Sequence, residues 1–72
     1  MNTVTKRWMG PAPTHCDLCC APITKVFIDG RTVHGCWANM CEACHSQVGV
    51  GLGTGKGQKY DRDGESWIKV AG

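Results

Sequence analysis

The chain has 72 residues, with eight basic and six acidic side chains and a formal net charge of +2. This length allows one small domain, and the mild charge excludes both a strongly basic nucleic-acid binder and a chain held unfolded by self-repulsion. Only twelve residues are Leu, Ile, Val or Phe, so a domain of this size needs disulfides or a structural metal to stabilise its fold.

The N-terminal residues 1–13 predict a flexible arm, followed by a single zinc-binding domain over residues 14–72. The first ten residues lack the apolar run of a signal peptide, and no stretch approaches the ~18 apolar residues of a membrane span, so we expect a cytoplasmic protein without a membrane partner. Within the arm, Arg7 and Trp8 are candidate contacts to nucleic acid or to a protein partner, because both side chains can stack on a base or ring.

Two Cys-x-x-Cys pairs, Cys16/Cys19 and Cys41/Cys44, are separated by 21 residues. Each pair can direct two thiolates at one ion, and two pairs complete the tetrahedron that Zn²⁺ prefers. A reducing compartment keeps these thiols available for metal. The spacing therefore predicts a zinc site with Cys16, Cys19, Cys41 and Cys44 as ligands.

Between the two pairs, residues 23–28 and 31–37 are rich in β-branched and aromatic side chains. The dipeptide Asp29-Gly30 between them is typical of a two-residue hairpin turn, which would place Val26 opposite Val33. This register also puts Cys36 inside the second strand, as a small buried side chain.

A short helix is expected to begin near Cys41 and to end at Gly49 as a glycine C-cap. The order of knuckle, hairpin and helix resembles the treble-clef zinc finger and implies a small metal-stabilised α+β fold. An all-β zinc ribbon, in which both cysteine pairs lie on hairpin turns, is the alternative, although residues 42–43 and 46–47 suit a helix better.

Other side chains near the pairs leave the ligand set partly open. Cys20 can replace Cys19 if the latter points away, and His15 or His45 can substitute for a thiolate, although four cysteines already suffice. On an oxidised sample, Cys20 and Cys36 can form a disulfide, which a cytoplasmic location opposes.

Glycine occupies every second position from Gly49 to Gly57. If this segment is extended, one of its faces carries no side chains, which lets an aromatic ring or another backbone approach closely. Alternatively, the bare face meets phosphate or a partner's backbone, with Lys56 and Lys59 supplying charge, or the segment is a mobile loop. Beyond it, residues 58–60 and 66–70 predict a second hairpin, with a loop over residues 61–65 that contains Asp63-Gly64, and this hairpin is expected to pack against the zinc module.

The run from Trp37 to His45, continued by the glycine-rich segment to Tyr60, resembles small zinc-finger-like proteins encoded by bacteriophages. This resemblance covers a third to a half of the chain and implies a virus-encoded protein acting in the bacterial cytoplasm. It implies no activity for individual residues.

The sequence predicts a zinc-stabilised binding module, with nucleic acid slightly favoured as its partner through Arg7, Trp8, Arg31, Lys56 and Lys59. A protein-interaction adaptor that modulates a host protein is the alternative. An enzyme with a small-molecule substrate is not expected, because four thiolates close the metal's coordination shell and the chain leaves little room for a substrate pocket.

Overall fold

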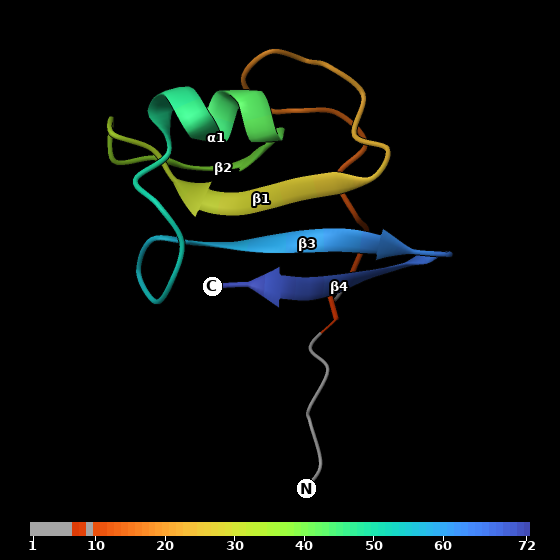
Figure 1. Cartoon of the computed structure of the whole chain (residues 1–72). Helices are drawn as coiled ribbons and strands as arrows, with labels where there is room; N and C mark the ends of the chain where they lie inside the picture. Colours follow the sequence, from red (N-terminus) through yellow and green to blue (C-terminus); the bar gives the residue numbers. More distant parts are fainter. Residues whose placement is uncertain (1–6, 9) are drawn as a thin grey trace, which may run out of the picture.

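The computed structural model describes residues 7–8 and 10–72 as an α+β domain with a single antiparallel sheet (Figure 1). The elements in chain order are β1 (Val26–Arg31), β2 (Trp37–Met40), α1 (Glu42–Val48), β3 (Gly57–Asp63) and β4 (Ser66–Ala71). The strands lie in the order β2-β1-β3-β4, and α1 packs over β1 and β2 on one face of the sheet. The small α+β fold is therefore confirmed, and the all-β alternative is wrong because residues 42–48 are helical.

The first hairpin exists, but its predicted turn and register are wrong. Asp29 and Gly30 lie inside β1, opposite Asn39 and Ala38 of β2. The chain instead reverses between Thr32 and Cys36, and several bonds stabilise the reversal there.

In that turn the Thr32 amide and hydroxyl both donate to the carbonyl oxygen of Cys36, at 2.8 and 3.0 Å. Gly35 supplies the left-handed backbone, with φ of 94°, that a tight reversal requires. The new register exposes Val33 and Cys36, which the sequence had placed within a strand, so the prediction of a buried Cys36 is also wrong.

Neighbouring residues of β1 point to opposite faces of the sheet, and each face has its own core. On the helix side, Ile28 and Met40 are buried beside the cysteine pairs. The cluster on this side consists of Cys16, Ala38 and Met40, packed against Cys41, Cys44 and Val48. The opposite side has a second cluster, formed by Ile23, Phe27 and Trp67 together with Trp8, Ala12 and Tyr60.

The second cluster is aromatic and includes part of the N-terminal segment. The Trp8 ring meets Phe27 and Tyr60 edge-on, with centroid separations of 5.2 and 5.3 Å. The Trp8 amide donates to the Trp67 carbonyl oxygen at 2.9 Å, so the chain at residue 8 runs beside β4. Residues 1–6 and 9 of the proposed arm lie outside the described residues, and the domain boundary at residue 13 stays a prediction.

The alternating glycines do not form the extended strip that one interpretation of the sequence required. Gly51 and Gly53 have φ of 118° and 124°, and the chain then turns back on itself, with the Gly57 amide donating to the Gly53 carbonyl oxygen at 3.0 Å. Gly57 is buried in β3, where an added Cβ would lie 3.0 Å from the Cα of Gly30 in β1. Close backbone approach therefore explains Gly57, whereas left-handed conformation explains Gly51 and Gly53.

Two remaining expectations concern the ends of elements. The helix begins where predicted, with Cys41 as N-cap, but Gly49 has φ of −74° and is no left-handed cap. A side chain at Gly49 would collide with the His45 ring, which accounts for glycine there. The second hairpin is confirmed, with Asp63 opposite Ser66 and β3 paired to β1.

Candidate metal centre

The first cysteine pair lies on a tight knuckle that precedes β1. The Cys16 amide donates to the Ala21 carbonyl oxygen at 2.8 Å, and the Cys20 amide donates back to the Cys16 carbonyl oxygen at 2.9 Å. Inside this loop the Leu18 amide lies 3.4 Å from the Cys16 sulfur, so it donates to that thiol or thiolate. The knuckle therefore folds around one sulfur and turns the second, Cys19, toward the same side.

The second pair comes from the start of α1. Cys41 is the N-cap, and the amide of His45 donates to its carbonyl oxygen at 3.0 Å. Cys44 follows in the first turn, and residues three apart on a helix share a face, so both sulfurs point to the knuckle.

Asp17 joins the knuckle to the sheet. Its amide donates to the Asn39 carbonyl oxygen at 2.9 Å, and its Oδ2 accepts a bond from the Asn39 amide at 2.8 Å. Because Asn39 lies two residues before Cys41, these bonds also fix the distance between the two cysteine pairs.

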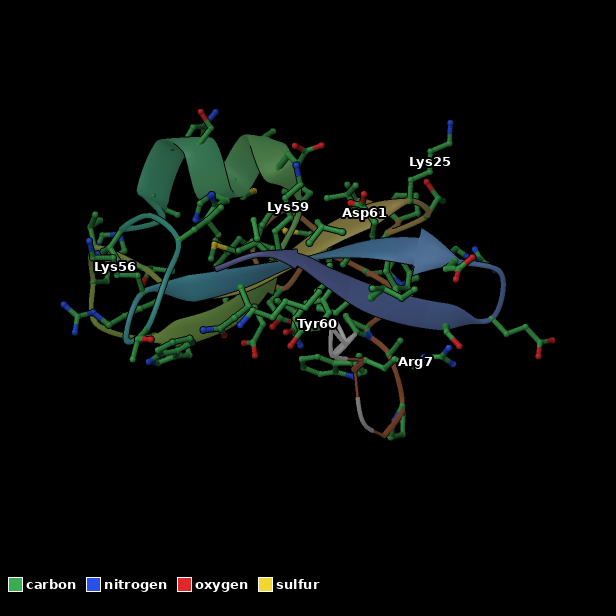
Figure 2. All side chains as sticks on the ribbon, turned by 60° about the horizontal axis from the view of Figure 1, so that its bottom comes forward. Arg7, Lys25, Lys56, Lys59, Tyr60 and Asp61 are labelled. Atoms are coloured by element: carbon green, nitrogen blue, oxygen red, sulfur yellow. The ribbon has the colours of Figure 1, made fainter. Side chains whose placement is uncertain are left out.

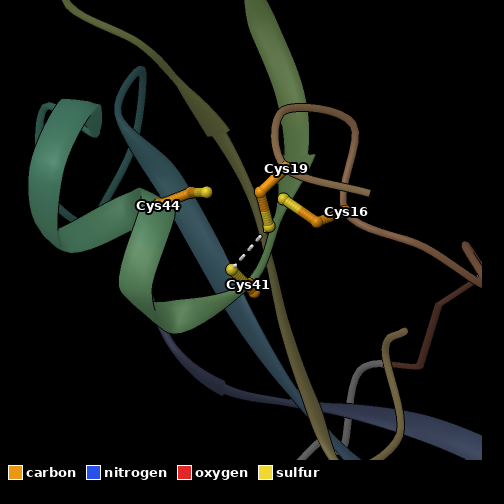
Figure 3. A group of neighbouring side chains, drawn as sticks. All are labelled: Cys16, Cys19, Cys41 and Cys44. Atoms are coloured by element: carbon orange, nitrogen blue, oxygen red, sulfur yellow. Dashed lines mark hydrogen bonds between the residues drawn. The ribbon is translucent and has the colours of Figure 1, made fainter. Parts of the chain in front are cut away.

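The four sulfur atoms all lie within 4.8 Å of one another (Figure 3). Those of Cys19 and Cys41, which come from different pairs, are 3.7 Å apart. A tetrahedral ion with metal–sulfur bonds of ~2.3 Å requires sulfur–sulfur edges of about 3.8 Å. The four cysteines therefore form a cluster that can hold one metal ion without rearrangement of the backbone.

The thiols in this cluster differ in how readily they ionise. Burial opposes ionisation of Cys16, but backbone hydrogen bonds from Cys19, Cys41 and Leu18 outweigh it and lower the thiol pKa from 9.0 to about 6. Hydrogen bonds with the sulfurs of Cys19 and Cys41, followed by burial, raise the pKa of Cys44 to about 12. One thiolate thus forms easily and the last forms only with difficulty, unless a cation is present to offset their mutual repulsion.

The other candidate ligands lie outside the cluster. Cys20 and Cys36 are exposed free thiols, so the disulfide considered for them is absent between these two described residues. The His45 ring forms a 3.0 Å hydrogen bond through Nε2 with the Gly51 carbonyl oxygen, and His15 is exposed beside the Thr14 hydroxyl. Sequence spacing alone had already favoured the four cysteines that converge.

Three of the residues predicted to bind nucleic acid, Arg7, Lys56 and Lys59, lie apart from one another on the domain (Figure 2). Arg7 lies beside β4, where its guanidinium is 3.5 Å from the Ser66 hydroxyl. Lys56 is at the opposite end of the sheet in Figure 2, in the turn before β3. The Arg31 amide donates to the Lys56 carbonyl oxygen at 2.8 Å, so the backbones of these two basic residues lie side by side.

The remaining two candidates already have partners within the domain. The Lys59 ammonium lies 3.2 Å from the Glu42 carboxylate of α1. Trp8 packs in the aromatic cluster, and its indole nitrogen donates to the Pro11 carbonyl oxygen at 3.0 Å. A cation and a ring that are held in this way lose part of their capacity to bind phosphate or a base.

Sequence reasoning missed an apolar groove beside the cluster, with a volume of about 420 Å³. We call it the knuckle groove, and it is lined by Asp17, Leu18, Thr32, His34, Cys36, Trp37, Ala38 and Val48. Leu18 and Trp37 are 47% and 49% exposed. In the sequence, the one indication of this groove was Leu18, an apolar residue between two predicted ligands. The incorrect hairpin register placed Trp37 elsewhere, so its proximity to Leu18 was not predicted.

Among the described residues, no helix is long and apolar enough to cross a lipid bilayer. No protein-family model, no curated protein and no solved structure matches this sequence. The likeness to phage-encoded proteins stays a prediction.

Proposed function

We propose that this chain is a zinc-stabilised binding module in which the ion has a structural role. The convergence of four sulfurs from two separate stretches of chain carries the proposal. Tetrahedral sites with four thiolates suit zinc or iron, and zinc supplies structural stability without redox chemistry. Cys16, Cys19, Cys41 and Cys44 would hold the ion and fill its coordination shell, so the proposal includes no catalytic step.

Metal analysis tests this part of the proposal. Protein purified under reducing conditions is expected to contain one zinc ion per chain, and the Cys44→Ser variant is expected to lose most of it. Cys36→Ser is the matched control, because Cys36 is a free thiol outside the cluster. Iron in place of zinc, or equal metal content in the two variants, would contradict the assignment.

The arrangement also favours a treble-clef-like module. A knuckle supplies the first two ligands, the β1–β2 hairpin follows, and the N-cap and first turn of α1 supply the other two. The β3–β4 hairpin extends the sheet on the side of β1 away from β2. Stable thiolate ligation fits a reducing compartment, such as the bacterial cytoplasm that the phage resemblance implies.

As its partner we propose a protein rather than a nucleic acid. The basic candidates are dispersed, and Lys59 is paired with Glu42, whereas the knuckle groove exposes apolar surface next to the metal cluster. Nucleic-acid binding has one observation in its favour, the proximity of Arg31 to Lys56.

Binding to mixed-sequence oligonucleotides at two salt concentrations decides between these partners. Phosphate contacts release counterions, so a nucleic-acid module would bind and lose affinity steeply with salt. We expect no such binding by the zinc-loaded chain. Salt-sensitive binding that Arg31→Ala and Lys56→Ala both weaken would contradict the choice of a protein partner.

A further inference from the structure

The knuckle groove is built by elements that the cysteine cluster joins. Leu18 lies between two ligands on the knuckle, and Val48 is the last residue of the helix that begins with the other two. The Val33 amide donates to the Val48 carbonyl oxygen at 2.8 Å, which attaches the turn after β1 to the helix end. An ion in the cluster would therefore fix the two walls of the groove relative to each other.

At the edge of the sheet beside the groove, the backbone groups of one β2 residue, Trp37, are free to form hydrogen bonds. The amide and carbonyl groups of Arg31 bond to Lys56 and Val50, away from β2. Backbone groups alternate in direction along an antiparallel pair, so those of Trp37, which is paired with Arg31, point outward. The next backbone groups that point outward along β2 are those of Asn39, and they are bonded to Asp17. Among the described residues, none forms a hydrogen bond with the Trp37 backbone.

The lining of the groove carries one formal negative charge, on Asp17, while the nearest basic residue of the sheet, Arg31, lies opposite Trp37 outside the lining. Asp17 is the only carboxylate among its lining residues, and no Lys or Arg is present there. Four thiolates around a divalent ion would add a formal charge of about −2 on the same side. A partner that complements this surface must combine an apolar group with positive charge.

We propose that the knuckle groove binds an extended segment of a partner protein, with a bulky apolar side chain in the groove and a Lys or Arg beside it. This inference rests on the proposed function and specifies its binding site. The apolar side chain would cover Leu18 and Trp37, the basic group would approach Asp17, and the segment's backbone would bond to the open edge at Trp37.

Nuclear magnetic resonance with the zinc-loaded full chain tests this proposal. The ligand is the peptide acetyl-Thr-Lys-Phe-Lys-Val-amide, compared with versions in which Phe is replaced by Ala or both Lys by Glu. We expect amide shifts at residues 17–18, 32–38 and 48, and binding at least about tenfold weaker for each altered peptide, the loss that ~1.4 kcal/mol produces.

Two variants of the protein separate the apolar and charged contributions. Leu18→Ser removes an exposed apolar wall, and we expect it to weaken binding about tenfold. Asp17→Asn removes the charge but retains an oxygen that can accept a hydrogen bond from the Asn39 amide. We expect this variant to bind the peptide several-fold more weakly at low salt, and the difference from the unaltered protein to disappear at high salt. Val70→Ser is the control, because Val70 is 52% exposed on β4, at the other edge of the sheet.

Zinc content is measured in every sample, so that two failures can be told apart. The groove proposal would be overturned if the amide shifts were absent or fell elsewhere, or if Leu18→Ser did not weaken binding. If the same samples contained a full zinc complement, the proposed zinc module would still stand. The same amides shifting with a mixed-sequence oligonucleotide, but not with the peptide, would assign the groove to nucleic acid and also overturn the proposal.

Discussion

Cys20 has a left-handed backbone, with φ of 64°, at the point where the knuckle turns back toward β1. A side chain in this conformation costs roughly 1 kcal/mol, which glycine avoids. The hydrogen bond from the Cys20 amide to the Cys16 carbonyl oxygen fixes the turn that brings Cys16 and Cys19 to the same side. The cysteine cluster therefore depends on a strained residue that is not itself one of its four members.

Replacing Cys20 by glycine is expected to raise the free energy of unfolding of the metal-loaded protein by about 0.5 kcal/mol. Relief of the left-handed strain exceeds the greater chain entropy that glycine adds to the unfolded state. Urea unfolding measures the change. Cys20→Ala keeps the strain and should leave stability nearly unaltered, so equal stability of the Gly and Ala variants would contradict this interpretation, as would loss of metal in either.

Asp29 is a second residue with an unfavourable environment, which here opposes ionisation of its carboxyl group. Partial burial in β1 raises the pKa of its carboxyl above the usual 3.8. A raised pKa in the folded state favours the protonated form there, so this carboxyl stabilises the fold only at low pH and costs free energy once it ionises. At neutral pH the ionised Asp29 carboxylate therefore slightly destabilises the folded protein.

We expect Asp29→Asn to raise the free energy of unfolding at pH 7 by a few tenths of a kcal/mol, since the side chain is still largely hydrated. The advantage should shrink as the pH falls through the raised pKa, because Asp29 then becomes neutral. Urea titrations of both proteins at several pH values, with zinc content monitored, measure it. A lower stability of the Asn variant at pH 7 would contradict the expected sign.

At the scale of elements, the sheet separates two cores, and the N-terminal segment belongs to the one without the cysteines. Trp8, Phe27, Tyr60 and Trp67 form a chain of ring contacts that joins the N-terminal segment, β1, β3 and β4. Aromatic side chains bury large areas, so Trp8 contributes to stability although it lies outside the regular strands. Because these contacts cover part of the Trp8 ring, they leave less of it available to stack on a base.

Trp8→Ala is expected to lower the free energy of unfolding by about 2 kcal/mol, somewhat less than for a fully buried Trp because its side chain is half-buried. Zinc stoichiometry should not change, since the cysteines lie on the other face. Val70→Ala, at an exposed position, should cost less than about 0.5 kcal/mol. Similar effects of the two substitutions in thermal unfolding would show that the N-terminal segment adds no stability.

The elements that sequence predicts best here are those specified by neighbouring residues. The ligand pairs, the helix start at Cys41 and the hairpin around Gly64 all follow from spacings of a few positions. Asp29-Gly30 misled because its local preference for a turn is overridden by distant partners: Gly30 fits closely against Gly57, a contact that no local pattern reveals. The knuckle groove was missed for the same reason, since three separate segments of the chain build it.

For the whole molecule, the cysteine cluster joins parts that share little buried apolar surface. On the helix side the buried apolar residues are Ile28 and the cluster of Cys16, Ala38 and Met40, and Cys16 is itself a proposed ligand. Binding of structural zinc is worth roughly 10–16 kcal/mol in small zinc modules, comparable to or greater than the roughly 5–15 kcal/mol that stabilises an ordinary domain. Loss of the ion is therefore expected to cost the module its folded state.

Removal of the metal tests this claim most directly. We predict that a strong chelator under reducing conditions collapses the dispersion of the amide resonances, that dispersion returns when Zn²⁺ is added back, and that Mg²⁺ at the same concentration restores nothing. A chain freed of metal, as verified by elemental analysis, that kept its native amide dispersion would contradict the central role of the four cysteines.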